Sequence, residues 1–222
     1  MTKIAWPDQF WKDLVPPCHI DTDALRKARD SAAAQVLEAS AGRPIVAVSG
    51  SGLPGKHKKE AQFVGALIAQ LGLTLITGGV DGAMFDATEA FLAASAKLPA
   101  GTTAGAAIRV IPADVKRLQK AKELSPCLPG ATCIFTDLET RSHVGPDSRN
   151  HVLIATADVV LCLPGQEGSK SEARLAKQVY HKPVIAYGTP GRGEEDWKQS
   201  IDAFHIGLTE NPEAWLRRTL NL

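Results

Sequence analysis

Short apolar runs recur along the chain and alternate with longer segments of helical periodicity. Six such runs predict strands, at residues 44–48, 73–77, 106–111, 131–136, 159–163 and 184–187. Their apolar residues are nearly continuous, which is typical of strands buried on both faces of a parallel sheet. The segments around them predict helices, at about residues 23–40, 57–71, 83–94, 147–156 and 169–180.

This alternation of strands and helices predicts an α/β fold with an open, doubly wound parallel sheet. Strands one, two and five are each followed by a glycine-rich loop, at residues 49–52, 78–82 and 164–168. Because crossovers between parallel strands are right-handed, we expect these loops to meet at the carboxyl edge of the sheet. Peptide N–H groups in such loops, and the start of the following helix, are typical of an anion-binding site.

The two ends of the chain depart from this alternation. Residues 1–42 predict an arm and one helix, and residues 43–222 predict the main domain. Residues 194–222 predict two short helical extensions with Leu208 between them. The arm is expected to pack onto the main body or onto a second subunit. The tryptophans lie in these terminal parts, and we expect them to serve subunit contact: Trp6, Trp11, Trp197 and Trp215.

Composition narrows the choice of partners and compartment. Lys and Arg number 25 against 24 Asp and Glu in 222 residues, so the chain carries almost no net charge. This balance disfavours nucleic acid as a partner, and the basic stretch at residues 56–59 predicts a solvated helix face. With no signal-peptide pattern and no run of about 20 apolar residues, we expect a cytoplasmic protein that does not span a membrane. The four cysteines lack metal-binding spacing and predict free or buried thiols, with no metal and no cofactor.

The first glycine loop does not fit two common nucleotide motifs. Residues 50–55 read Gly-Ser-Gly-Leu-Pro-Gly, and Pro54 would disturb the tight turn of a dinucleotide site. Gly55-Lys56 is followed by His57 instead of the Ser or Thr that holds Mg²⁺ in a phosphate-binding loop of the Walker type. Dinucleotide binding and phosphoryl transfer are therefore disfavoured.

Three other motifs agree with a known family. Residues 164–172 read Pro-Gly-Gln-Glu-Gly-Ser-Lys-Ser-Glu, residues 78–84 read Gly-Gly-Val-Asp-Gly-Ala-Met, and Arg149-Asn150 precedes the fifth strand. On these motifs, residues 45–187 resemble the LOG family of cytokinin-activating phosphoribohydrolases, whose signature is PGGxGTxxE. The wider group is the LOG/DprA-like Rossmann superfamily, which includes molybdenum cofactor carriers. The resemblance implies a three-layered, Rossmann-like fold, a homodimer, and hydrolysis of a nucleoside 5′-monophosphate to free base and ribose 5-phosphate.

The resemblance also assigns roles to residues. Arg149 and Glu172 would be the catalytic pair, since a fixed carboxylate stabilises the oxocarbenium-like state and an arginine fork can clamp the substrate. The residues expected to bind the phosphate or nucleotide lie in the glycine loops: Ser49, Gly50, Gly78, Gly79, Gly82, Gly165, Gly168 and Ser169.

Each of these residues also has a purely structural interpretation. Ser169 and Glu172 have the S-x-x-E spacing of a capping box, which stabilises a helix start without any further function. Arg149 would then be a surface arginine, paired for example with Asp147. His151 is expected to be an ordinary polar loop residue.

The phosphate loop departs from the family at two positions. Gln166 replaces a glycine, and its side chain would crowd the approach of a phosphate to the backbone. Glu167 adds a negative charge there, which is unfavourable unless it points to solvent or is offset by Lys170. The alternative to an enzyme is therefore a non-catalytic protein that binds or carries a nucleotide or another phosphorylated cofactor.

Overall fold

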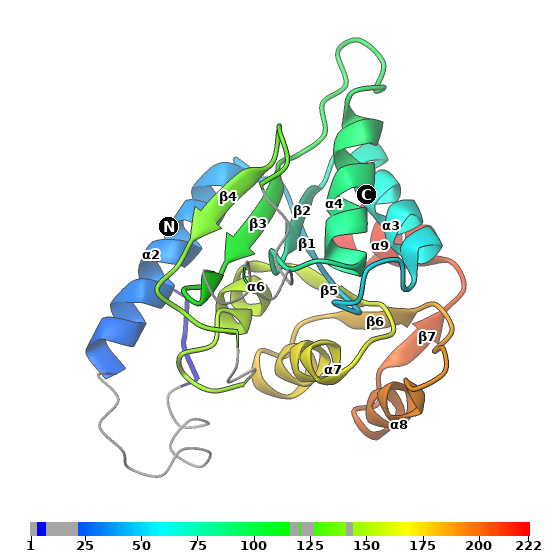
Figure 1. Cartoon of the computed structure of the whole chain (residues 1–222). Coiled ribbons are helices and arrows are strands. Elements are labelled where there is room, and N and C mark those ends of the chain that lie inside the picture. The colour runs from blue at the N-terminus through cyan, green and yellow to red at the C-terminus, as the bar shows by residue number, and fades with distance from the viewer. Residues whose placement is uncertain (1–3, 8–21, 116–119, 121–126, 141–143) are drawn as a thin grey trace.

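The computed structural model describes residues 4–7, 22–115, 120, 127–140 and 144–222 (Figure 1). Seven strands of this part of the chain form one sheet, in the order β4-β3-β2-β1-β5-β6-β7, and every neighbouring pair is parallel. The strands are β1 (Ile45–Ser49), β2 (Thr74–Thr77), β3 (Ala107–Ile111), β4 (Thr132–Phe135), β5 (Val159–Cys162), β6 (Val184–Tyr187) and β7 (Gly207–Thr209). The predicted α/β class and the doubly wound parallel sheet are confirmed.

The chain winds outward from β1 to β4 and then returns to place β5 on the other side of β1. Ser49 at the end of β1 is in register with Cys162 at the end of β5. The strand order therefore reverses between β1 and β5, and ligands of open α/β sheets bind beside such a reversal, at the carboxyl ends of the strands.

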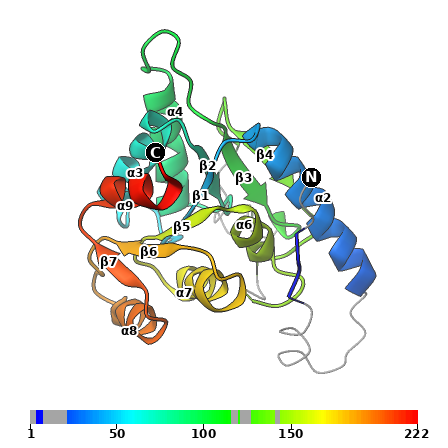
Figure 2. The same ribbon diagram turned by 180° about the vertical axis from the view of Figure 1, so that it is seen from behind.

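Helices cover both faces of the sheet, which gives the expected three layers (Figures 1 and 2). They are α2 (Thr22–Ser40), α3 (Lys58–Gln70), α4 (Ala83–Ser95), α6 (Asn150–Thr156), α7 (Glu167–Arg174), the π-helix η1 (Leu175–Val179), α8 (Glu195–Ala203) and α9 (Pro212–Leu220). One apolar core joins the sheet to α2, α6, α7, η1 and α8, and a second joins it to α3, α4 and α9. Apolar side chains of strand residues are thus buried on both faces.

The C-terminal part differs from its prediction in two ways. Leu208 lies in β7, a seventh strand that pairs with β6, rather than in a link between helices. This edge strand has only three residues and leaves Leu208 exposed, so its sequence has no apolar run that would predict a strand. Trp197, expected at a subunit contact, is only 1% exposed and belongs to the core between α8 and the sheet.

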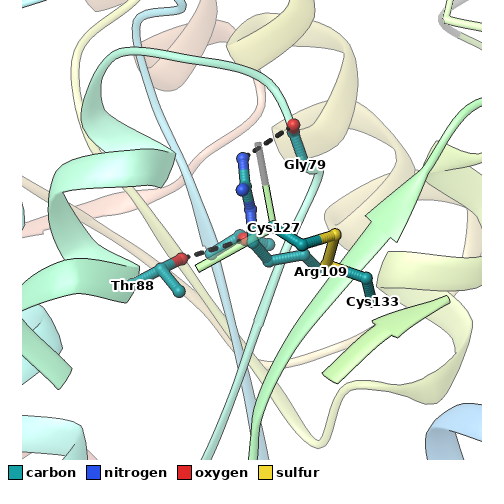
Figure 3. Close-up of a disulfide and its surroundings, with 6 residues drawn as sticks. Gly79, Thr88, Arg109, Cys127 and Cys133 are labelled. Carbon is teal, nitrogen blue, oxygen red and sulfur yellow. Dashed lines mark hydrogen bonds between the residues drawn. A yellow bond between two sulfur atoms is a disulfide. The ribbon is translucent and has the colours of Figure 1, made fainter. Parts of the chain in front are cut away.

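The cysteines also differ from their prediction. Cys127 and Cys133 form a disulfide just before and within β4, with their Cα atoms 6.3 Å apart (Figure 3). Gly130, at φ 90°, lies in the turn that reverses the chain between them. Cys162 is a free thiol as expected, and burial raises its pKa to about 12. Cys18 lies outside the described residues.

The described part of the N-terminal arm packs onto α2. The indole Nε1 of Trp6 donates to Asp30 Oδ1 at 2.7 Å, and the Arg29 guanidinium lies 5.3 Å from the centre of the Trp6 ring. Trp11 lies outside the described residues. None of the helices described is both long and apolar enough to cross a bilayer. The division at residue 42, the homodimer and the cytoplasmic location stay predictions.

Candidate functional site

The three glycine loops meet around the backbone of Ser51. The Ser51 N–H donates to Pro164 O at 3.0 Å, and the Ala83 N–H, just after the second loop, donates to Ser51 O at 2.9 Å. The Ser51 hydroxyl accepts from the Leu53 N–H at 3.2 Å. One buried serine backbone thus joins the loops that follow β1, β2 and β5.

Two of the predicted binding glycines are required by this junction. A Cβ on Gly82 would lie 2.3 Å from Ser51 O, and a Cβ on Gly165 would lie 2.8 Å from Ser51 N. Gly82 also has φ 73°, which disfavours residues with a side chain. Backbone packing therefore explains both glycines without a ligand.

The Gly78-Gly79 pair lies between two buried arginines. A Cβ on Gly78 would lie 2.5 Å from Arg149 Nη2, so the absence of a side chain makes room for that guanidinium. Arg109, on β3, donates from Nη2 to Gly79 O at 2.8 Å (Figure 3). Burial lowers the pKa of Arg109, and the nearby Asp81 carboxylate opposes this shift. Arg109 was not among the predicted site residues, because the other residues of β3 are apolar and predict a buried core strand.

A cavity of about 420 Å³ is lined by residues of all three glycine loops, at the reversal of strand order. Five of the predicted site residues line it: Gly50, Arg149, Gly168, Ser169 and Glu172. The other lining residues were not among the predicted site residues: Gly52, Leu53, Val80, Met84, Thr140, Asn150, Gln166 and Glu167. The remaining predicted residues do not line the cavity: Ser49, Gly78, Gly79, Gly82 and Gly165. Among the described residues, no cluster of three or more His, Cys, Asp or Glu is placed to hold a metal.

Arg149 and Glu172 form a buried ion pair in this cavity. Arg149 Nη1 lies 3.4 Å from Glu172 Oε1 and also donates to Asn150 Oδ1, while the side chains of the pair are 3% and 6% exposed. Burial raises the pKa of Glu172, although Arg149 and the Ser49 hydroxyl act in the opposite direction. Burial likewise lowers the pKa of Arg149, and Glu172 opposes that shift. The partner of Arg149 is thus Glu172 and not Asp147.

The start of α7 is not a capping box. The helix begins at Glu167 with Gln166 as its N-cap, and no side chain caps it. The Ser169 hydroxyl donates to Leu163 O at 2.9 Å, and Glu172 contacts Arg149 instead of the helix start. The capping interpretation of Ser169 and Glu172 is therefore wrong.

The two departures from the family loop are accommodated. Gln166 has φ −100°, a conformation open to any residue, so its position does not require glycine, and its side chain lines the cavity. Glu167 is 72% exposed and forms an ion pair with Lys170, one turn later on α7. Glu167 borders the cavity, but its negative charge is largely exposed to solvent and is offset by Lys170, which are the two conditions expected for an anion to bind.

His151 fixes the segment that carries Arg149. It is fully buried in α6, which contradicts the expectation of a polar loop residue. Its Nε2–H donates to Val144 O at 3.0 Å, and its Nδ1 accepts from the Tyr180 hydroxyl at 2.7 Å. Burial lowers the pKa of His151 to about 4, so the ring is neutral and can both donate and accept.

A known protein family matches most of this chain. The model of the SLOG cluster4 family matches residues 43–215. The chain belongs to the SLOG cluster4 family. No curated protein sequence matches the chain.

Several solved structures share the SLOG fold of this chain. The molybdenum cofactor carrier protein of Chlamydomonas reinhardtii is 22% identical, with a TM-score of 0.56 over 81% of this chain and 100% of that one. The molybdenum cofactor binding protein of Rippkaea orientalis is 24% identical, with a TM-score of 0.57 over 81% and 98%. DNA processing protein A of Helicobacter pylori, which binds single-stranded DNA, is 18% identical, with a TM-score of 0.54 over 84% and 83%. At 18 to 24% identity, these similarities establish the fold alone.

Proposed function

We propose that this SLOG protein binds a phosphorylated small molecule of nucleotide type in the cavity and acts as a binding or carrier protein for it. The observation that carries the proposal is the buried side chain of Arg149, which lines a cavity built on the three glycine loops. The cavity volume of about 420 Å³ falls within the range of roughly 300 to 1,000 Å³ typical of small-molecule sites.

The two sides of the cavity suit the two parts of such a ligand. Gly50, Gly168 and the start of α7 offer peptide N–H groups and the positive end of a helix dipole, which favour a phosphate. Leu53, Val80 and Met84 supply an apolar wall, which favours a planar ring.

Binding without turnover is favoured by the state of Glu172. Its carboxylate is paired with Arg149, and burial raises its pKa, so the group is less available to stabilise positive charge on a sugar. The side chain of Gln166 also lines the cavity where the family loop has glycine. Two proteins described as binding or carrying the molybdenum cofactor share the fold of this chain, which also supports a binding or carrier function.

The second candidate is the nucleoside 5′-monophosphate phosphoribohydrolase activity of the LOG family. It is favoured by the contact between Arg149 and Glu172, which the resemblance names as the catalytic pair. In this reaction water adds to C1′ of the ribose, the N-glycosidic bond breaks, and the base leaves with a proton. Glu172 must be ionised to hold the water, so the rate would rise as the pH passes the raised pKa of this carboxyl.

A binding and turnover assay separates the candidates. We expect the purified protein to bind at least one of AMP, GMP, CMP, UMP and ribose 5-phosphate by calorimetry, and to release no free base by chromatography. Arg149→Lys, which keeps the charge but loses the planar fork, should weaken binding, whereas Glu172→Gln should retain it. Base release that Glu172→Gln abolishes would establish the hydrolase instead. If none of these compounds binds, neither function holds. Binding of a single-stranded DNA oligonucleotide at low salt would then test a function like that of DNA processing protein A.

A further inference from the structure

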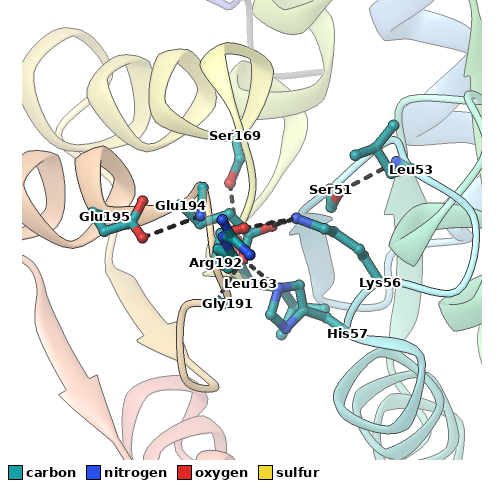
Figure 4. Close-up of polar contacts among 11 residues, drawn as sticks. Ser51, Leu53, Lys56, His57, Leu163, Ser169, Gly191, Arg192, Glu194 and Glu195 are labelled. Carbon is teal, nitrogen blue, oxygen red and sulfur yellow. Dashed lines mark hydrogen bonds and ion pairs between the residues drawn. The ribbon is translucent and has the colours of Figure 1, made fainter.

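Glu194 joins two loops at the carboxyl edge of the sheet, the one after β1 and the one after β6. Its side chain is 0% exposed and accepts three hydrogen bonds: from His57 Nε2 at 2.6 Å, from the Gly191 N–H at 2.8 Å, and from Lys56 Nζ at 3.3 Å (Figure 4). Part of the basic stretch at residues 56–59, predicted as a solvated helix face, is therefore anchored to the segment before α8.

The anchoring segment is itself well held. The Gly193 N–H donates to Glu195 Oε1 at 3.1 Å, and Lys56 Nζ also lies 3.4 Å from Arg192 O. Burial alone would raise the pKa of Glu194, but the hydrogen bonds from Gly191, His57 and Lys56 outweigh it and hold the pKa below its ordinary value. The carboxylate is thus ionised at neutral pH and pairs with the two basic side chains.

The backbone of His57 has a left-handed conformation, which carries a local energetic cost. This N-cap residue of α3 has φ 55° and ψ 29°, in the left-handed region that disfavours residues with a side chain, and its own side chain does not cap the helix. The hydrogen bond to Glu194 offsets this local cost. A strained backbone of this kind persists only where its surroundings fix it.

The other end of the same loop forms a wall of the cavity. Gly50, Gly52 and Leu53 line the cavity, and Leu53 is 44% exposed. We propose that Lys56, His57 and Glu194 form a clasp that holds the loop at residues 50–57 in its ligand-binding position. The three are positioning residues, since none of them lines the cavity. This inference rests on the proposed function, because the clasp acts on the site assigned there.

Two substitutions test the clasp. Glu194→Gln removes the charge that holds both basic residues. His57→Gly removes the imidazole but suits the left-handed backbone, so this variant should fold even if Glu194→Gln does not. Asp86→Asn is the matched control, because Asp86 is also a buried carboxylate paired with a lysine at the start of α3, 3.3 Å from Lys58 Nζ.

The test uses two measurements: nucleotide affinity by calorimetry, and the rate of amide hydrogen exchange at residues 50–57. For the nucleotide that the wild type binds best, both clasp variants should weaken affinity by about ten-fold, within the usual range of coupling between contacting residues. Exchange at residues 50–57 should speed up in both variants and stay unchanged in Asp86→Asn.

A purely structural role predicts a different pattern, in which His57→Gly keeps wild-type affinity because it relieves backbone strain. Wild-type affinity and exchange in the folded clasp variants would overturn the clasp and leave the proposed function intact. A wild-type protein that binds no member of the nucleotide panel would overturn both.

Discussion

The ion pair between Arg149 and Glu172 leads to a quantitative prediction for Arg149→Met. Methionine fills much of the arginine volume but leaves the Glu172 carboxylate, 6% exposed, without its cation at 3.4 Å. Breaking a buried ion pair in this way costs roughly 3 to 5 kcal/mol. Since single domains are stable by only about 5 to 15 kcal/mol, the variant should lose a large share of its free energy of unfolding.

The loss should depend on pH with a definite sign. Burial already raises the pKa of Glu172 above its ordinary value of 4.5, and removal of Arg149 removes an interaction that lowers it. A carboxyl whose pKa is higher in the folded state binds its proton more tightly there, so folding is favoured at low pH. The deficit of Arg149→Met relative to the wild type is therefore smallest in acid, and it grows as the pH rises above the folded pKa of Glu172 in the wild type toward the still higher pKa of this carboxyl in the variant.

Urea unfolding followed by circular dichroism, from acid to neutral pH, measures this deficit. The double variant Arg149→Met/Glu172→Gln should recover most of the loss, because no charge is then left buried. Arg217→Met is the control, since it breaks an exposed pair with Glu213 at 2.9 Å that is worth about 0 to 1 kcal/mol. A loss in Arg149→Met no larger than in the control, or one that does not change with pH, would refute the reasoning.

Two further predictions follow from the glycine loops and the disulfide. Gly78→Ala should fold but lose nucleotide affinity, because its Cβ would displace the guanidinium of Arg149; calorimetry should show a smaller change for Gly207→Ala, which lies in β7, does not line the cavity, and would place its Cβ 3.2 Å from the Ile185 side chain. Reduction of the Cys127–Cys133 disulfide should lower the free energy of unfolding by about 2 kcal/mol, the loop-closure value for a separation of 6 residues, as measured by urea unfolding with and without dithiothreitol. A double Cys→Ser variant that still responds to dithiothreitol would contradict this assignment.

The sequence predicted most of the fold because fully buried parallel strands leave continuous apolar runs. Strands β1 to β6 lie within about one residue of their predicted bounds. The three-residue β7 leaves Leu208 exposed, and its position is set by pairing with β6 rather than by its own pattern. The disulfide was missed for a related reason, since it depends on a chain reversal at Gly130 that spacing alone does not reveal.

The site was predictable in its location but not in its contacts. Strand order brings the loops together, so a site at the carboxyl edge follows from topology. The sequence did not indicate that Gly78 makes room for Arg149, or that His57 is held by Glu194, because these partners are distant in the chain and meet only after folding. Which atom lies next to a glycine is determined by the folded structure and cannot be predicted from the local sequence.

The junction at Ser51 has a consequence for comparing sequences. Gly82 and Gly165 are small because protein backbone passes within 3 Å of where their side chains would begin. A descendant that had lost its ligand would still be constrained to keep them, since any larger residue would separate the loops. The glycine spacing is therefore determined by how this edge of the sheet is assembled. A change of ligand would instead change the residues between the glycines, such as Gln166, which line the cavity and tolerate replacement.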